Sequence, residues 1–323
     1  MNNLVYLVYL LGSLVSESIW ALDLSAYQLP DGAITVHRSG DAVDPYFAMK
    51  ALWAARQLDD PAPIETRAWI KWMLPRQEED GRFLRYCQRN GRWQACDGSD
   101  ADDSSLALWL ELLNEAAPRS MPARWALSTR RAERALENLL DKESGVYHVS
   151  PTTNVALLMD NAEIYAALKH IGELHNRAGD KVGGQKYLMQ AKSLRLAMGR
   201  VFGSRGKDLL NWNNGDTSGE KFYPHRLAHI YPWLHDMDTS TFGTMLSWQV
   251  WLDRYADAWL ARTDDPYPWG LVALVAYRRG SNEMVDHWLK NSSALREGEN
   301  WNVLEDAILQ GLARARLNGQ GNE

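Results

Sequence analysis

The chain has 323 residues, of which 46% are hydrophobic and 24% charged, and its formal net charge is -6. This apolar content is enough for one large core and excludes a disordered chain. The acidic balance offers no basic stripe for phosphates, so we expect no nucleic-acid partner.

The N-terminus begins Met-Asn-Asn and continues with the apolar run LVYLVYLLGSLV. Such a run is short for a membrane span and suits the apolar region of a signal peptide. We expect a signal peptide or N-terminal anchor over residues 1–22 and one domain over residues 23–323. A buried first helix is the alternative. The protein is then periplasmic or secreted, and it contacts a membrane only if the segment is retained.

Long segments rich in Ala and Leu recur along the chain and predict inner helices buried on several sides. Their predicted starts are Asp44, Asp102, Asp160, Tyr223, Asp265 and Asn300. More polar amphipathic segments between them predict outer helices at residues 65–77, 122–140, 183–202, 239–261 and 282–295. This alternation predicts an all-α (α/α)6 toroid of six helical hairpins. The outer partner of the first inner helix must come from the N-terminal region or the chain end.

Links after the outer helices carry turn residues, as in EEDGRFLRY, KESGVYHVS and GSRGKDLLNWNN. Gly ends a helix there and an extended segment follows, which predicts short β-hairpins. Because these links run into the next inner helices, the loops and the helix starts should share one rim of the toroid. That rim is the candidate binding site.

The two cysteines, Cys87 and Cys96, bracket a segment with the turn signal Asn90-Gly91 between two strand-like runs. A disulfide across this hairpin is expected, and it would persist in an oxidising compartment. Two reduced structural thiols are the alternative.

The segments DGRF, SDADDSSLALWLELL and LLMDNAEIYAALKHIGEL resemble the six-hairpin glycosidase superfamily over roughly residues 40–315. This resemblance implies the toroid fold and an activity on carbohydrates. In the unsaturated glucuronyl hydrolases, one essential aspartate belongs to an Asp-Asn pair at the start of an inner helix and another lies one hairpin earlier. Asp160-Asn161 matches the first, and Asp102 or Asp103 is placed like the second. A dedicated uronate-binding motif is not evident.

Hydrolysis of a glycosidic bond usually needs one protonated carboxylic acid and one carboxylate. Asp103 and Asp160 are the preferred pair, with Asp44 and Asp102 as substitutes. A separation of roughly 6.5–9.5 Å would favour inversion of the anomeric centre and about 5–5.5 Å retention. The alternative for each aspartate is an N-cap, which stabilises a helix start by about 1 kcal/mol.

Fifteen Trp and thirteen Tyr against five Phe form an unusual aromatic set, because Trp and Tyr join a flat apolar face to a polar edge. Such surfaces suit sugar rings, although many of these residues have core spacing. The candidate sugar-stacking residues are Trp53, Trp93, Trp212, Trp233 and Trp301.

The segment KFYPHRLAHIYPWLHDMD is the densest polar and aromatic patch. Tyr223, His225, Arg226 and His229 are candidate substrate-binding residues, together with Asn161. His225 and His229 share a helix face, but no HExxH motif or third ligand accompanies them. We therefore expect no metal and no other cofactor. If the protein were a lyase or epimerase, Tyr223 with a histidine would abstract a proton and Arg226 would neutralise a uronate carboxylate.

Taken together, these patterns predict a glycoside hydrolase that acts on a bacterial polysaccharide or oligosaccharide through paired aspartates. Two alternatives stay open at this point. One is a polysaccharide lyase or uronate epimerase, and the other is a non-catalytic glycan-binding or scaffold protein that keeps the toroid and its aromatic rim.

Overall fold

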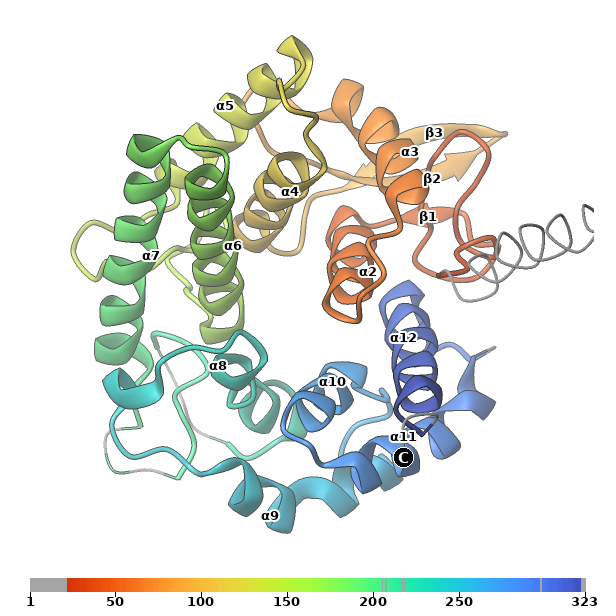
Figure 1. The fold of residues 1–323 in the computed structure, drawn as a ribbon, viewed down its shortest axis with the longest axis vertical. Helices are drawn as coiled ribbons and strands as arrows, with labels where there is room; N and C mark the ends of the chain where they lie inside the picture. Colours follow the sequence, from red (N-terminus) through yellow and green to blue (C-terminus); the bar gives the residue numbers. More distant parts are fainter. Residues whose placement is uncertain (1–21, 205, 207, 216–218, 297, 321–323) are drawn as a thin grey trace, which may run out of the picture.

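The computed structural model describes residues 22–320 except 205, 207, 216–218 and 297, and its helices form two concentric rings (Figure 1). The inner ring consists of α2 (Pro45–Gln57), α4 (Asp102–Ala116), α6 (Leu158–Arg177), α8 (Tyr231–Leu234), α10 (Gly270–Arg278) and α12 (Val303–Gln320). The outer ring consists of α3 (Pro63–Met73), α5 (Ala123–Asn138), α7 (Lys181–Phe202), α9 (Trp248–Ala261) and α11 (Asn282–Ser292). The predicted (α/α)6 toroid is confirmed.

Burial separates the two kinds of helix as the sequence pattern predicts. Every residue of α4 from Asp102 to Leu113 is buried, because other helices cover it on several sides. The outer helix α5 buries one stripe, Ser128, Thr129, Ala132, Ala135 and Leu136. This spacing of three and four residues places the stripe on the face toward the inner ring.

The ring closes where the last inner helix, α12, packs against the first, α2. Gly311 makes the approach close, since a Cβ atom there would lie 2.5 Å from Leu58 Cδ1. An ion pair of 2.6 Å between Arg314 and Asp60 lies beside this contact. The segment before α2 also bridges the two ends, because the Val303 amide donates to the Val36 carbonyl at 2.9 Å.

Two inner helices differ from the prediction, and proline accounts for both. The segment from Tyr223 does not form one helix: a π-helical turn, Phe222–Arg226, comes first, and α8 is a separate helix of four residues. Pro232 has no N–H group to continue the earlier turn. Helix α10 begins at Gly270 rather than at Asp265, since Pro266 and Pro268 occupy the intervening stretch.

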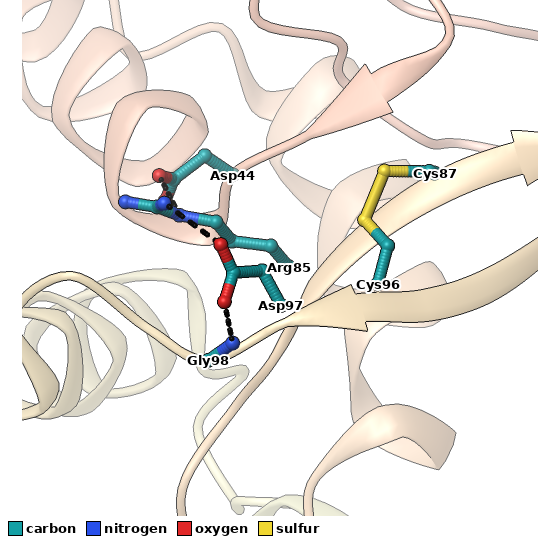
Figure 2. The surroundings of a disulfide bond; sticks show 6 residues. All are labelled: Asp44, Arg85, Cys87, Cys96, Asp97 and Gly98. Carbon is teal, nitrogen blue, oxygen red and sulfur yellow. Dashed lines mark hydrogen bonds and ion pairs between the residues drawn. A yellow bond between two sulfur atoms is a disulfide. The ribbon is translucent and has the colours of Figure 1, made fainter.

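One predicted hairpin is confirmed as part of a three-stranded antiparallel sheet in the order β1 (Ala42–Val43), β2 (Arg85–Arg89), β3 (Arg92–Asp97). Its turn places Asn90 at φ 51° and Gly91 at φ 71°, the left-handed values that a two-residue hairpin of type I′ requires. The predicted disulfide joins Cys87 to Cys96, with Cα atoms 5.7 Å apart (Figure 2).

The other two predicted hairpins are reduced to single β-bridges. One joins Leu140 to Tyr147, and the other joins Leu157 to Asn213. The second bridge ties the loop after α7 to the start of α6, so this loop still reaches the inner-helix rim.

The predicted signal peptide or anchor over residues 1–22 lies outside the described residues except for Leu22, and it stays a prediction. From residue 22 onward, no described helix is both long enough and apolar enough to cross a membrane.

The disulfide predicts a measurable stabilisation of the hairpin. Replacing both cysteines, Cys87→Ser with Cys96→Ser, should lower the free energy of unfolding by roughly 2–3 kcal/mol, because the reduced chain gains the entropy of an open loop. Chemical denaturation of the double variant and the oxidised wild type measures the difference. Equal midpoints with equal slopes would show that this bond adds no stability.

Candidate active site

The first turns of α4 and α6 place two aspartates inside the ring. Asp103 is the second residue of α4 and is fully buried, and Asp160 is the third residue of α6 and is 7% exposed. Neither residue is the N-cap of its helix, since those positions are Ala101 and Leu157. The capping alternative therefore does not explain these two carboxyl groups.

Both carboxyl groups retain an oxygen without a protein partner. Asp103 Oδ1 accepts the Ser104 amide at 2.8 Å, but Oδ2 of Asp103 and Oδ2 of Asp160 have no hydrogen-bond partner among the described residues. Burial, reinforced by the charge of Asp160, holds the pKa of Asp103 well above its usual range. Burial and the charge of Glu163 do the same to the pKa of Asp160. A buried acid whose pKa is raised in this way can serve as a general acid.

Two further charged residues belong to this cluster, and the sequence analysis missed both. Glu163 lies one turn after Asp160 on α6, and its Oε1 is 2.8 Å from Lys50 Nζ on α2. The Tyr46 hydroxyl donates to the same Glu163 oxygen at 2.9 Å. A signal was present, because Lys50 interrupts the apolar inner-helix segment YFAMKALWAA. A lysine there needs a buried partner.

An aromatic platform made of Tyr223, Tyr267 and Trp269 lies near these acids. Tyr223 stacks on Trp269 with ring centroids 5.3 Å apart, and the Tyr267 ring lies 5.7 Å from that of Trp269. Burial raises the pKa of Tyr223, and the charge of Asp160 contributes. Tyr223 is 47% exposed and Tyr267 is 41% exposed. Trp269 and Tyr267 were not predicted, although the run DPYPWG places two aromatic rings next to prolines.

Asp100 lies in the loop before α4, with its side chain 84% exposed and 3.4 Å from Arg85. Its charge contributes to the raised pKa of both Asp160 and Tyr223. Asp100 is therefore an exposed carboxylate at the edge of the cluster, and the sequence analysis passed over it in favour of Asp102 and Asp103.

The two substitute aspartates are held in structural contacts. Asp44 is the N-cap of α2, accepting the Tyr46 amide at 3.0 Å, and its Oδ2 lies 2.8 Å from Arg85 Nε (Figure 2). Asp102 pairs with Arg82 at 3.2 Å. Burial raises the pKa of each, and the arginine partner opposes that shift. Asp44 and Asp102 therefore have the partners that Asp103 and Asp160 lack.

Asn161 is fully buried and holds a loop rather than facing the cluster. Its side-chain oxygen accepts the Tyr147 amide at 2.8 Å, and its side-chain nitrogen donates to the Tyr147 and Leu157 carbonyls. These three bonds occupy both ends of the amide. The position beside Asp160 therefore serves to fix the start of α6.

The histidines and Arg226 of the polar patch are dispersed. His229 is buried and its Nδ1 accepts the Leu210 amide at 3.1 Å. Burial lowers the pKa of His229 to about 4. Arg226 pairs with Asp264 and lies against the Tyr255 ring. His225 packs against Trp212 with ring centroids 5.6 Å apart. Of this patch, Tyr223 and Tyr231 interact electrostatically with Asp160, whose charge contributes to the raised pKa of each.

The remaining candidate tryptophans lie in packed surroundings. Trp93 donates to Asp31 at 2.9 Å and packs on Trp72. Trp301 donates to Asp306 at 3.2 Å. Trp233 packs edge-on against His229 and Trp248, and Trp53 lies beneath the Lys50 ammonium at 4.0 Å. These contacts explain the residues through packing, as the core-spacing alternative predicts. A group of three metal-ligating side chains is not found among the described residues.

A further buried acid, Glu305, lies in the first turn of α12. Its Oε2 accepts the Gly270 amide at 2.8 Å, and burial raises its pKa to about 7. This bond ties the starts of α10 and α12 together. Glu305 is thus a third buried acid with a raised pKa at an inner-helix start, although its partner is a backbone amide rather than another carboxyl group.

Comparison with known proteins identifies the fold. No family model matches the sequence, and no curated protein matches it. Among solved structures, an α-amylase from Clostridium perfringens is 9% identical, with a TM-score of 0.57 over 90% of this chain and 95% of the other. The protein Rex8A from Paenibacillus barcinonensis, complexed with xylose, is 14% identical, with a TM-score of 0.57 over 90% and 86%.

The fold that the chain shares with these structures is the (α/α)6 toroid. A reducing-end-xylose releasing exo-oligoxylanase agrees, at 14% identity and a TM-score of 0.54 over 91% of this chain and 87% of the other. At such identities the likeness concerns the backbone. The fold that the resemblance implied is therefore confirmed.

The raised pKa values predict a pH dependence of stability. Above the unfolded value of 3.8, the folded protein binds more protons at Asp103 and Asp160 than the unfolded chain does. The free energy of unfolding therefore falls as the pH rises toward the folded-state values. Between about pH 5 and pH 8, the free energy of unfolding should fall less in Asp103→Asn than in the wild type. Urea denaturation at each of the two pH values measures the difference.

Asp238→Asn provides the control for that measurement. Its hydrogen bonds with Ser240 and its ion pair with Arg195 lower the pKa of Asp238 to about 2, so its stabilisation is lost only in acid. Its slope between the two pH values should equal that of the wild type. Parallel slopes for Asp103→Asn and the wild type would mean that Asp103 ionises as easily in the folded state as in the unfolded chain.

Proposed function

We propose that the protein is a glycoside hydrolase that cleaves a polysaccharide or oligosaccharide, with Asp103 and Asp160 as its acid–base pair. The supporting observation is the burial of both carboxyl groups at neighbouring inner-helix starts, each with an unpartnered oxygen and a raised pKa. The names of the fold neighbours, an α-amylase and an exo-oligoxylanase, are consistent with a carbohydrate substrate.

In this proposal the pair carries one proton. The protonated carboxyl group donates it to the glycosidic oxygen as the C–O bond breaks, and water attacks the anomeric carbon while the ionised carboxylate accepts a proton from it. The charge of Asp160 raises the pKa of Asp103, which supports such sharing, because two close carboxyl groups in a buried site resist ionising together.

The aromatic platform of Tyr223, Tyr267 and Trp269 is the proposed sugar-binding surface. Its stacked rings are partly exposed and lie near Asp160. Flat aromatic faces suit the apolar faces of sugar rings. The platform therefore supports an extended saccharide whose scissile bond reaches the acid pair.

The arrangement gives less support to a lyase or epimerase. That chemistry needs Tyr223, a histidine and Arg226 to meet at one uronate. Arg226 is paired with Asp264, and His229 accepts a hydrogen bond from the Leu210 amide. Burial also raises the pKa of Tyr223, which makes its phenolate harder to form as a base.

Export from the cytoplasm is part of the proposal. The apolar run near the N-terminus has the form of a signal peptide, and the disulfide Cys87–Cys96 suits an oxidising compartment. A periplasmic or secreted location would bring the protein to a bacterial polysaccharide.

The test is reducing-end release from neutral, amino and uronic-acid polysaccharides, measured beside the ultraviolet absorbance of unsaturated products. Asp103→Asn and Asp160→Asn should each lower turnover by roughly 10²–10⁴-fold, because acid–base groups contribute rates of that order. Tyr223→Ala should mainly raise KM. Unsaturated products, with Tyr223→Ala the most impaired variant, would instead identify a lyase.

A matched control is Asp306→Asn. Asp306 is also a buried aspartate in the first turn of an inner helix, but Arg296 binds both of its oxygens, at 2.7 and 2.9 Å. Its substitution should lower stability more than turnover per folded molecule. Glycan binding without turnover in the wild type would contradict the hydrolase proposal and favour a binding protein.

A further inference from the structure

A fully buried ion pair lies at the centre of the acid cluster. Lys50 and Glu163 both have 0% exposed side chains, and their Nζ and Oε1 atoms are 2.8 Å apart. The ammonium group also lies 4.0 Å above the Trp53 ring. Bulk solvent does not reach either side chain at these exposures, so the pair interacts in a low-dielectric interior.

Stability alone explains such a pair poorly. Removing two charges from water costs several kcal/mol per ion, and replacing a buried pair with apolar residues is often neutral or stabilising. Apolar side chains would suit the surroundings, since Met49, Ala51 and Leu52 flank Lys50 and are all buried. The charges of Lys50 and Glu163 therefore call for another role.

The position of Glu163 suggests that role. Glu163 follows Asp160 by three residues on α6, so both side chains lie on one helix face. The Oε1 atom of Glu163 is occupied by Lys50 and Tyr46, while its Oε2 has no hydrogen-bond partner among the described residues. The buried cluster thus contains three carboxyl groups, from Asp103, Asp160 and Glu163, and a single ammonium group from Lys50.

The charged and titratable groups around the aspartate pair come from several elements. They are Lys50 and Tyr46 from α2, Asp103 from α4, Asp160 and Glu163 from α6, Tyr231 from α8, Tyr223 from the π-helical turn Phe222–Arg226 and Asp100 from the loop before α4. Burial holds the pKa of Tyr46 and Tyr231 well above the usual range. Both phenols are therefore neutral donors at ordinary pH.

We infer that Glu163 and Lys50 are positioning residues whose paired charges set the protonation of the Asp103–Asp160 pair. Lys50 can neutralise only one of the three carboxyl groups, and the one that it contacts is Glu163. The aspartate pair then retains a proton for donation. This inference rests on the proposed function, because it explains how the same acid pair keeps the proton that it donates.

The electrostatic contributions agree with this geometry. The charge of Glu163 raises the pKa of both Asp103 and Asp160, and the charge of Lys50 lowers that of Asp160. For Asp160 the contribution of Glu163 exceeds that of Lys50. Loss of Glu163 alone therefore lowers the pKa of the pair more than loss of both residues does.

The test compares the pH–rate profiles of E163Q, the double variant K50M/E163Q and the wild type. In E163Q the high-pH limb of the profile, where the rate falls as the acid loses its proton, should move to lower pH by about one unit or more. A nearby like charge changes the pKa of a carboxyl group by such amounts. In the double variant the limb should lie between those of E163Q and the wild type. Turnover at pH values below the limb should change much less.

The matched control is E111Q. Glu111 is 4% exposed and pairs with Arg56. This pair joins α4 to α2 near their C-terminal ends, whereas the Lys50–Glu163 pair joins α6 to α2. E111Q loses a buried ion pair in the same way, but its pH–rate profile should keep the wild-type limb. A limb displaced equally in E111Q and E163Q would assign the shift to general loosening and overturn the inference.

A second readout separates this inference from the proposed hydrolysis. Carboxyl ¹³C NMR titration, with Asp103→Asn and Asp160→Asn to assign the signals, follows protonation of the pair with no substrate present. A downward shift in E163Q supports the inference even if no polysaccharide is cleaved. Unchanged midpoints in E163Q, or a double variant shifted further than E163Q, would overturn it even if hydrolysis is observed.

Discussion

The structure depends on closing a ring of helices, because an inner helix is covered only when both of its inner neighbours are present. The contact between α12 and α2 completes that ring, and Gly311 brings the two backbones together where a larger residue would meet Leu58. The segment from Leu22 to Val43 ties the same two ends through hydrogen bonds to α12 and its preceding loop. Each inner helix can then be buried on several sides, as α4 is.

Ring closure also decides the chemistry of the interior. The side chains in the first turns of α4 and α6 are buried, so carboxyl groups placed there must find a partner or hold a proton. Asp44 and Asp102 have arginine partners, whereas Asp103 and Asp160 do not. The resulting difference in electrostatic surroundings separates the two acids that we propose as the catalytic pair from the two that have arginine partners.

Local features were predicted well where local physics controls them. The inner helices α2, α4, α6 and α12, the hairpin turn at Asn90-Gly91 and the disulfide all follow from periodicity, turn preference and spacing. The prediction of a single helix from Tyr223 was wrong, because it followed the spacing of the apolar residues and neglected the two prolines, which interrupt the helix. Asp103 and Asp160 stay a predicted catalytic pair. Glu163, Lys50 and Trp269 were missed, since their contacts are with neighbours from other hairpins.

The sequence by itself determined the helical repeat, the alternation of buried and amphipathic helices and the acidic starts of the inner helices. These properties depend on residues within a few turns of one another. Only the tertiary structure decided which starts meet, that Lys50 pairs with Glu163 across 113 positions, and that Asn161 and His229 are occupied by backbone groups. Burial and the distance between charges set these outcomes, and both are properties of the closed ring rather than of any one helix.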